Sequence, residues 1–186
     1  MPTPRDQLLA LIKDLAVVHG TVTLSSGRQA EYYVDLRRVT LHHAGAPLVG
    51  HVLLDRLEEV GLGAGEVDAV GGLTLGADPV ADALLHAAAS RGQGLDAFVV
   101  RKEAKAHGMQ RRIEGPDIAG RKVVVLEDTS TTGGSPITAV EAAREAGAEV
   151  LGVAVIVDRA TGAQEKIEAL GVPYHYLYSL TDLGLA

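Results

Sequence analysis

Valine-rich strands alternate with amphipathic helices along most of this chain. Short apolar runs predict strands at residues 67–72, 96–101, 122–127 and 149–157. Apolar positions at helical spacing predict helices at residues 5–19, 47–60, 78–90 and 136–147, with a shorter one near 163–170. This alternation is typical of an α/β fold, in which a mainly parallel twisted sheet is flanked by helices.

The first forty residues do not follow this alternation. The segment 22–38 (VTLSSGRQAEYYVDLRR) has β-branched and aromatic residues on both sides of a Ser-Ser-Gly turn, which predicts two short strands joined by a loop. Together with the helix at 5–19, expected to end near Gly20, they predict a small N-terminal hood (residues 1–40) packed on a core of residues 41–186. No repeat, low-complexity tract or long linker divides these 186 residues, so we expect a single domain.

Composition excludes several kinds of chemistry. The chain has no cysteine, which rules out disulfides, thiolate metal sites and cysteine nucleophiles. Its net charge of −7 disfavours general nucleic-acid binding, so any basic site must be local. Charged residues Asp6, Lys13 and Asp14 interrupt the apolar start of the chain, which therefore fits neither a signal peptide nor a membrane anchor. We expect a cytoplasmic protein with neither a nucleic-acid nor a membrane partner.

The strongest candidate site lies in residues 122–147. An apolar strand leads into Glu127 and Asp128, then into a loop of small and hydroxyl-bearing residues (129–135) that opens directly into a helix. Unpaired backbone N–H groups at such a helix start form a phosphate site. The two acids would repel a bare phosphate but can accept hydrogen bonds from sugar hydroxyls, so a ribose 5-phosphate fits. The alternative is an ordinary capped helix entry with a glycine turn.

Two further loops follow predicted strands. Residues 101–112 (RKEAKAHGMQRR) carry five basic side chains, one acid and His107, and are expected to form a lid over a polyanion such as diphosphate. A solvated charged loop is the alternative. Residues 71–79 (GGLTLGADP) could offer backbone amides to phosphate, or could form a tight turn in which Asp78 caps a helix that begins at Pro79.

Together these loops resemble the type I phosphoribosyltransferases, in particular the orotate phosphoribosyltransferase family. VVVLEDTSTTGGS is similar to that family's binding loop for 5-phosphoribosyl 1-diphosphate (PRPP), RKEAKAHG to its R-K-E-A-K-D-H-G lid, and TLSSGRQAEYYVD to its N-terminal segment. The resemblance runs from residue 22 to about residue 160. It implies transfer of the 5-phosphoribosyl group from PRPP to orotate, which gives orotidine 5′-monophosphate and diphosphate in pyrimidine nucleotide synthesis.

The resemblance also implies roles for single residues. Diphosphate would be bound by Arg101, Lys102, Lys105 and His107, with Lys105 and His107 as the catalytic candidates at the leaving group. Glu127 and Asp128 would hold the ribose hydroxyls, and the 5-phosphate would be bound by Thr129, Ser130, Thr131, Thr132, Gly133, Gly134 and Ser135. Orotate would be contacted by Ser26, Tyr33, Thr131 and Arg159, although Tyr32 and Tyr33 could equally be packing residues. Mg²⁺ would be carried by the substrate diphosphate without a protein metal site, and the lid would be shared across a homodimer.

Some positions depart from the family pattern. Ser25 and Leu75 stand where the family often has lysine, and Ala106 stands where aspartate is common. A phosphoribosyltransferase for another nucleobase, a nucleotide-sensing regulator and a weakened paralogue on the same fold therefore remain alternatives. The His42-His43 pair suggests a metal site, but adjacent side chains on a helix or strand are expected to point apart.

Overall fold

A six-stranded sheet forms the centre of the molecule in a computed structural model that describes residues 1–23, 27, 29–103 and 112–186. The strands are β3 (Ala69–Leu73), β4 (Asp96–Val100), β5 (Ile113–Glu114), β6 (Lys122–Ser130), β7 (Glu149–Asp158) and β8 (Tyr174–Ser179). Their order in the sheet is β5-β4-β3-β6-β7-β8, and all neighbours are parallel except the short edge pair β4 and β5. The predicted α/β fold with a mainly parallel sheet is confirmed.

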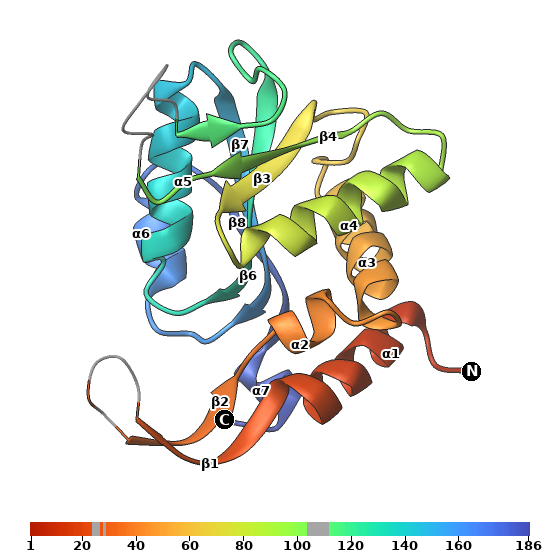
Figure 1. The fold of residues 1–186 in the computed structure, drawn as a ribbon, viewed down its shortest axis with the longest axis vertical. Helices are drawn as coiled ribbons and strands as arrows, with labels where there is room; N and C mark the ends of the chain where they lie inside the picture. The colour runs from red at the N-terminus through yellow and green to blue at the C-terminus, as the bar shows by residue number, and fades with distance from the viewer. Residues whose placement is uncertain (24–26, 28, 104–111) are drawn as a thin grey trace.

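Helices cover both faces of this sheet (Figure 1). On one side lie α3 (Gly45–Glu59) and α4 (Ala77–Ser90), and on the other lie α5 (Gly134–Glu145) and α6 (Ala163–Glu168). Along β6, Val124 and Leu126 belong to the core formed with α3 and α4. Val123 and Val125 belong to the core formed with α5 and α6, because successive side chains of a strand point to opposite faces of the sheet. A strand buried on both faces explains the unbroken valine run in the sequence.

The N-terminal segment forms a helix and a hairpin. The chain runs through α1 (Pro4–Leu11), a wider helical turn η1 (Ile12–Ala16), the antiparallel strands β1 (Val17–Thr23) and β2 (Gln29–Val34), and the short helix α2 (Arg37–Thr40). The prediction of a helix through residue 19 is therefore wrong beyond Ala16. Val17 and Val18 pair with Val34 and Tyr33, and this pairing between distant segments suits β-branched residues better than a helix does.

The hood is fastened to the last strand of the sheet. The Tyr178 hydroxyl on β8 donates to the Arg5 carbonyl oxygen at 2.7 Å, and Arg5 Nη2 donates to the Leu177 carbonyl oxygen at 2.5 Å. Leu8 and Ile12 are fully buried in the same core as α3 and α4. The helix α7 (Leu180–Leu183) follows β8 directly. No helix in the described ranges is long and apolar enough to span a membrane.

Candidate active site

A cleft of about 340 Å³ opens at the carboxyl ends of the parallel strands, beneath the β2–α2 segment of the hood. This is the edge at which parallel α/β sheets bind ligands. The residues that line it are Tyr33, Val34, Asp35, Leu36, Arg37, Leu73, Thr74, Leu75, Gly76, Lys102, Glu127, Asp128, Thr129, Thr131, Ser135 and Arg159. Eight of these residues are site candidates predicted from the sequence: Tyr33, Lys102, Glu127, Asp128, Thr129, Thr131, Ser135 and Arg159.

Glu127 and Asp128, the acidic pair, lie near the end of β6. The Asp128 N–H donates to Glu127 Oε1 at 3.0 Å, and the Thr129 N–H donates to Asp128 Oδ1 at 2.6 Å. Burial raises the pKa of Glu127 well above its usual range, and the charge of Asp128 raises it further. Burial also raises the pKa of Asp128. Two acids that share a buried site ionise reluctantly, so hydrogen-bond donors such as sugar hydroxyls would relieve an unfavourable interaction there.

The loop between β6 and α5 borders the cleft through Thr131 and Ser135. Gly133, the residue before α5, has φ of +81°, a conformation that favours glycine. Within the described chain no side chain caps this helix, which leaves its first N–H groups available to an anion. Thr131 and Ser135 line the cleft beside them, and the buried Thr129 Oγ1 has no hydrogen-bond partner among the described residues. These features fit a bound phosphate.

Three basic side chains, Lys102, Arg37 and Arg159, line the same cleft. Arg37 Nε donates to Asp35 Oδ1 at 2.8 Å, and this hydrogen bond holds the pKa of Asp35 below its usual value. Asp35 and Arg37 were not among the site residues predicted from the sequence. A signal was present in the sequence, because the two charges follow directly after an apolar strand in the segment YYVDLRR.

The β3–α4 loop also belongs to the cleft, through Thr74, Leu75 and Gly76. The peptide bond between Thr74 and Leu75 is cis. The alternative in which Asp78 caps a helix starting at Pro79 is wrong, because α4 already begins at Ala77 and its cap residue is Gly76. Asp78 instead lies in the first turn, where its Oδ2 accepts a hydrogen bond from the Thr74 hydroxyl at 2.7 Å.

Gly76 makes room for the acidic pair. A Cβ atom at this position would lie 2.5 Å from Glu127 Oε1 and 2.8 Å from Asp128 Oδ1. Real Cβ atoms do not approach other atoms this closely, so a larger residue at this position would require both carboxyl groups to move. Gly76 of the segment GGLTLGADP therefore shapes the site through close approach of the backbone.

Other predicted site residues lie beside the cleft. Arg101 lines a neighbouring cavity and pairs with Glu114 on β5, with Nη1 3.4 Å from Oε1. Ser130 is buried, and the Thr132 carbonyl oxygen accepts a hydrogen bond from Lys166 Nζ at 3.3 Å. The described lining of the cleft does not include Arg101, Ser130, Thr132, Gly133 and Gly134. Five positions of interest lie outside the described residues. They are the predicted site residues Ser26, Lys105 and His107, and the departures from the family pattern at Ser25 and Ala106.

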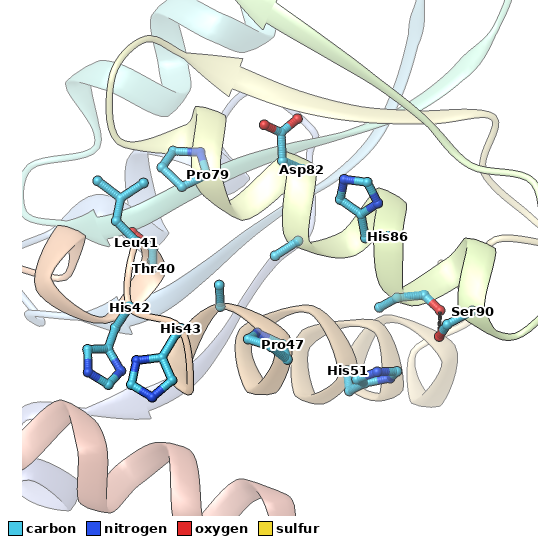
Figure 2. A pocket seen from close by; sticks show the side chains of 13 residues that line it. Thr40, Leu41, His42, His43, Pro47, His51, Pro79, Asp82, His86 and Ser90 are labelled. Carbon is cyan, nitrogen blue, oxygen red and sulfur yellow. Dashed lines mark hydrogen bonds between the residues drawn. The ribbon is translucent and has the colours of Figure 1, made fainter.

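A second cavity, of about 440 Å³, lies between the α2–α3 segment and α4 (Figure 2). The rings of His42 and His43 lie with their centroids 4.3 Å apart, so the expectation that they point apart is wrong. They occupy the turn between α2 and α3, where helical and strand geometry does not apply. Figure 2 shows His51 on α3 and His86 on α4 pointing in different directions. Across the described ranges, no three His, Asp or Glu side chains are grouped closely enough to hold a metal ion.

The fold and the cleft define a phosphoribosyltransferase domain, and the family model of the phosphoribosyl transferase domain matches residues 38–172. The chain is 69% identical to orotate phosphoribosyltransferase of Streptomyces avermitilis over the full length of both chains. It is 56% identical to the enzyme of Mycobacterium avium, covering 97% of this chain and 96% of that one. The chain belongs to the orotate phosphoribosyltransferase family.

Solved structures of high similarity carry the same family name. The orotate phosphoribosyltransferase of Mycobacterium tuberculosis in complex with Fe(III) dicitrate has a TM-score of 0.88 and 56% sequence identity, covering 98% of this chain and 100% of that chain. The same enzyme in complex with PRPP has a TM-score of 0.84 and 50% identity, again covering 98% and 100% of the two chains. The structural similarity therefore includes the N-terminal hood as well as the sheet.

Proposed function

We propose that this protein transfers the 5-phosphoribosyl group of PRPP to orotate and releases orotidine 5′-monophosphate and diphosphate. The observation that carries the proposal is the cleft, in which the acidic pair, the β6–α5 loop, Lys102 and Arg159 converge. In the reaction, the bond from C1 of the ribose to diphosphate breaks and a bond to the orotate ring nitrogen forms. The nitrogen loses its proton, and the bond electrons leave with diphosphate.

The β6 side of the cleft would hold the sugar phosphate. The backbone N–H groups at the start of α5, with the hydroxyls of Thr131 and Ser135, suit the 5-phosphate. Glu127 and Asp128, directly before this loop, suit the ribose hydroxyls as hydrogen-bond partners. This arrangement would fix the reacting carbon of the sugar between the loop and the hood.

Arg159 would select the base. Its guanidinium lines the cleft, its Nε is buried, and that atom has no hydrogen-bond partner among the described residues. A carboxylate such as that of orotate would provide a charge-assisted partner. Tyr33, which lines the same cleft, would pack against the base, and Thr131 would contact it.

The leaving diphosphate requires positive charge around it. Lys102 is placed in the cleft for this, and the proposed lid residues Lys105 and His107 would add hydrogen-bond donors and a proton source. The acidic pair offers carboxylate oxygens to an Mg²⁺ ion that would be carried mainly by substrate and water oxygens. When bound, Mg²⁺ neutralises part of the charge that develops on diphosphate.

A homodimer would complete the site. Arg101 pairs with Glu114 and lines a neighbouring cavity, whereas its neighbour Lys102 lines both that cavity and the cleft. In the proposed homodimer, Arg101 would serve the cleft of the neighbouring subunit. The large apolar side chains of Leu41 and Leu75 are 70% and 60% exposed, and they give a second copy an apolar surface to cover.

A direct assay tests the proposal. Purified protein with orotate, PRPP and Mg²⁺ is expected to consume orotate, measured by its absorbance, and to release an equal amount of diphosphate. Uracil and hypoxanthine are the control bases, and preferential turnover of either one would contradict the orotate assignment. Lys105→Ala is expected to lower kcat by roughly 10²-fold or more, which is typical of a positioned acid–base or electrostatic group. An unchanged kcat would remove Lys105 from that role.

A further inference from the structure

Adjacent tyrosines of the hood face different surroundings. Tyr32 and Tyr33 follow one another on β2, so their side chains point to opposite sides of the hairpin. Tyr33 lines the cleft. Tyr32 is not among the described residues that line the cleft, and its partly buried side chain packs against the core that includes α3 and α4. Tyr32 is therefore placed to act on the site through a neighbouring side chain, without touching the substrate.

That neighbour is Arg159. Its guanidinium carbon lies over the Tyr32 ring, 5.9 Å from the ring centroid, which is within the range of a cation–π interaction. The contact joins the hood to the loop after β7, two parts of the chain that are far apart in sequence. It therefore fixes the position of a cleft residue relative to the hood.

Other restraints on Arg159 act on its main chain. The Arg159 N–H donates to the Ser130 carbonyl oxygen at 3.0 Å, which fixes the backbone where β7 ends. Among the described residues, the guanidinium makes neither a hydrogen bond nor an ion pair, and its buried Nε has no partner. A long arginine side chain has considerable rotamer freedom, so an aromatic face beneath it limits the directions in which its N–H groups point.

We propose that Tyr32 is a positioning residue for the base, because its ring holds the Arg159 guanidinium with its donors directed into the cleft. This inference rests on the proposed function, in which Arg159 binds the carboxylate of orotate. Tyr32 thereby contributes to the preference for a base that bears a carboxylate. A preorganised arginine binds such a group without first losing its own conformational freedom.

Substitutions at position 32 that preserve its shape give the sharpest test. Phenylalanine keeps the ring face, whereas pentafluorophenylalanine, introduced at the same position, keeps the shape but removes the negative character of that face. The pentafluoro variant is expected to raise KM for orotate by about 2- to 30-fold, the range that corresponds to a lost cation–π contact. Tyr32→Phe is expected to keep KM near the parent value. KM for PRPP and the melting temperature are expected to stay unchanged in both variants.

Equal KM values for orotate in the phenylalanine and pentafluoro variants would overturn the positioning role. A double-mutant cycle with Arg159→Ala separates this role from a structural one, because the effect of the pentafluoro ring is expected to vanish when the arginine is absent. If the effect persists in that background, Tyr32 acts by another route. If Arg159→Ala alone leaves KM for orotate unchanged, the assignment of Arg159 within the proposed function fails. Tyr176→Leu, at an exposed position on β8 outside the cleft, is the control for a lost tyrosine.

Discussion

Glu127 is at once a site residue and a source of instability. The residue is 6% exposed and lies beside Asp128, and burial raises the pKa of its carboxyl group. The folded protein therefore holds this proton more tightly than the unfolded chain does. The resulting stabilisation is complete below the ordinary pKa of a glutamate and is lost as pH rises through the raised pKa.

Glu127→Gln is therefore expected to stabilise the ligand-free protein while it weakens catalysis. Glutamine keeps the oxygen that accepts from the Asp128 N–H and is neutral in the unfolded chain as well, so folding no longer has to protonate a buried acid. We expect the free energy of unfolding at pH 8 to rise by roughly 1 kcal/mol or more, because one pKa unit corresponds to about 1.4 kcal/mol. Denaturant unfolding at pH 5 and pH 8 measures this difference, with the exposed Glu141→Gln as the control. The expectation would be contradicted if the free energy of unfolding of the variant fell between pH 5 and pH 8 by as much as that of the parent.

At the scale of elements, the loop between β3 and α4 shapes the cleft because it has no side chain at Gly76. Gly76 precedes α4 and has an ordinary helical backbone conformation, so close approach to the acidic pair is the reason for glycine at this position. An alanine methyl group would push against both carboxyl groups. The β3–α4 loop, which carries Leu75 and Gly76, thus fits closely against the end of β6, which carries Glu127 and Asp128.

Gly76→Ala is expected to raise KM for PRPP and to lower kcat, together by about tenfold or more in kcat/KM, because small displacements of positioned groups are costly in catalysis. Gly94→Ala is the matched control, since a Cβ atom there meets nothing within 4 Å. Steady-state kinetics with PRPP as the varied substrate measures the effect. Equal kinetic constants in the two variants would show that the loop can move aside without consequence.

The same scale shows how far the sequence predicts the structure. Valine runs predict four of the six sheet strands, because strands buried on both faces need apolar residues throughout. No strand is predicted at β8, whose segment YHYLYS mixes buried and exposed tyrosines, nor at β5, which is two residues long. Glu127, Asp128 and the loop after them are recognisable because they are contiguous. The segments that carry Arg37 and Gly76 are visible in the sequence, but their place in the cleft, and the close approach of Gly76 to the acidic pair, depend on tertiary packing.

At the scale of the whole molecule, the proposed dimer can be tested by complementation. Lys105→Ala removes a cation of the proposed lid, and Asp128→Asn alters the cleft. If the lid of one subunit closes the cleft of the other, each mixed dimer of these two inactive variants contains one intact site. Random reassembly at equal concentrations is then expected to restore roughly one quarter of the parent activity.

A lid that closes its own cleft predicts a different outcome for this experiment. Every site in the mixed dimer would then carry one of the two defects, and no activity would return. Light scattering on the parent establishes the oligomeric state independently. A monomer under assay conditions would contradict the shared lid.

The bonds between Arg5 and the last strand have a consequence for biosynthesis. The hood supplies Tyr33, Asp35 and Arg37 to the cleft, and its helix is tied to Leu177 and Tyr178. In a nascent chain, the bonds of Arg5 with Leu177 and Tyr178 can form only after β8 has emerged from the ribosome. The hood therefore reaches its final attachment only when nearly all of these residues have been translated.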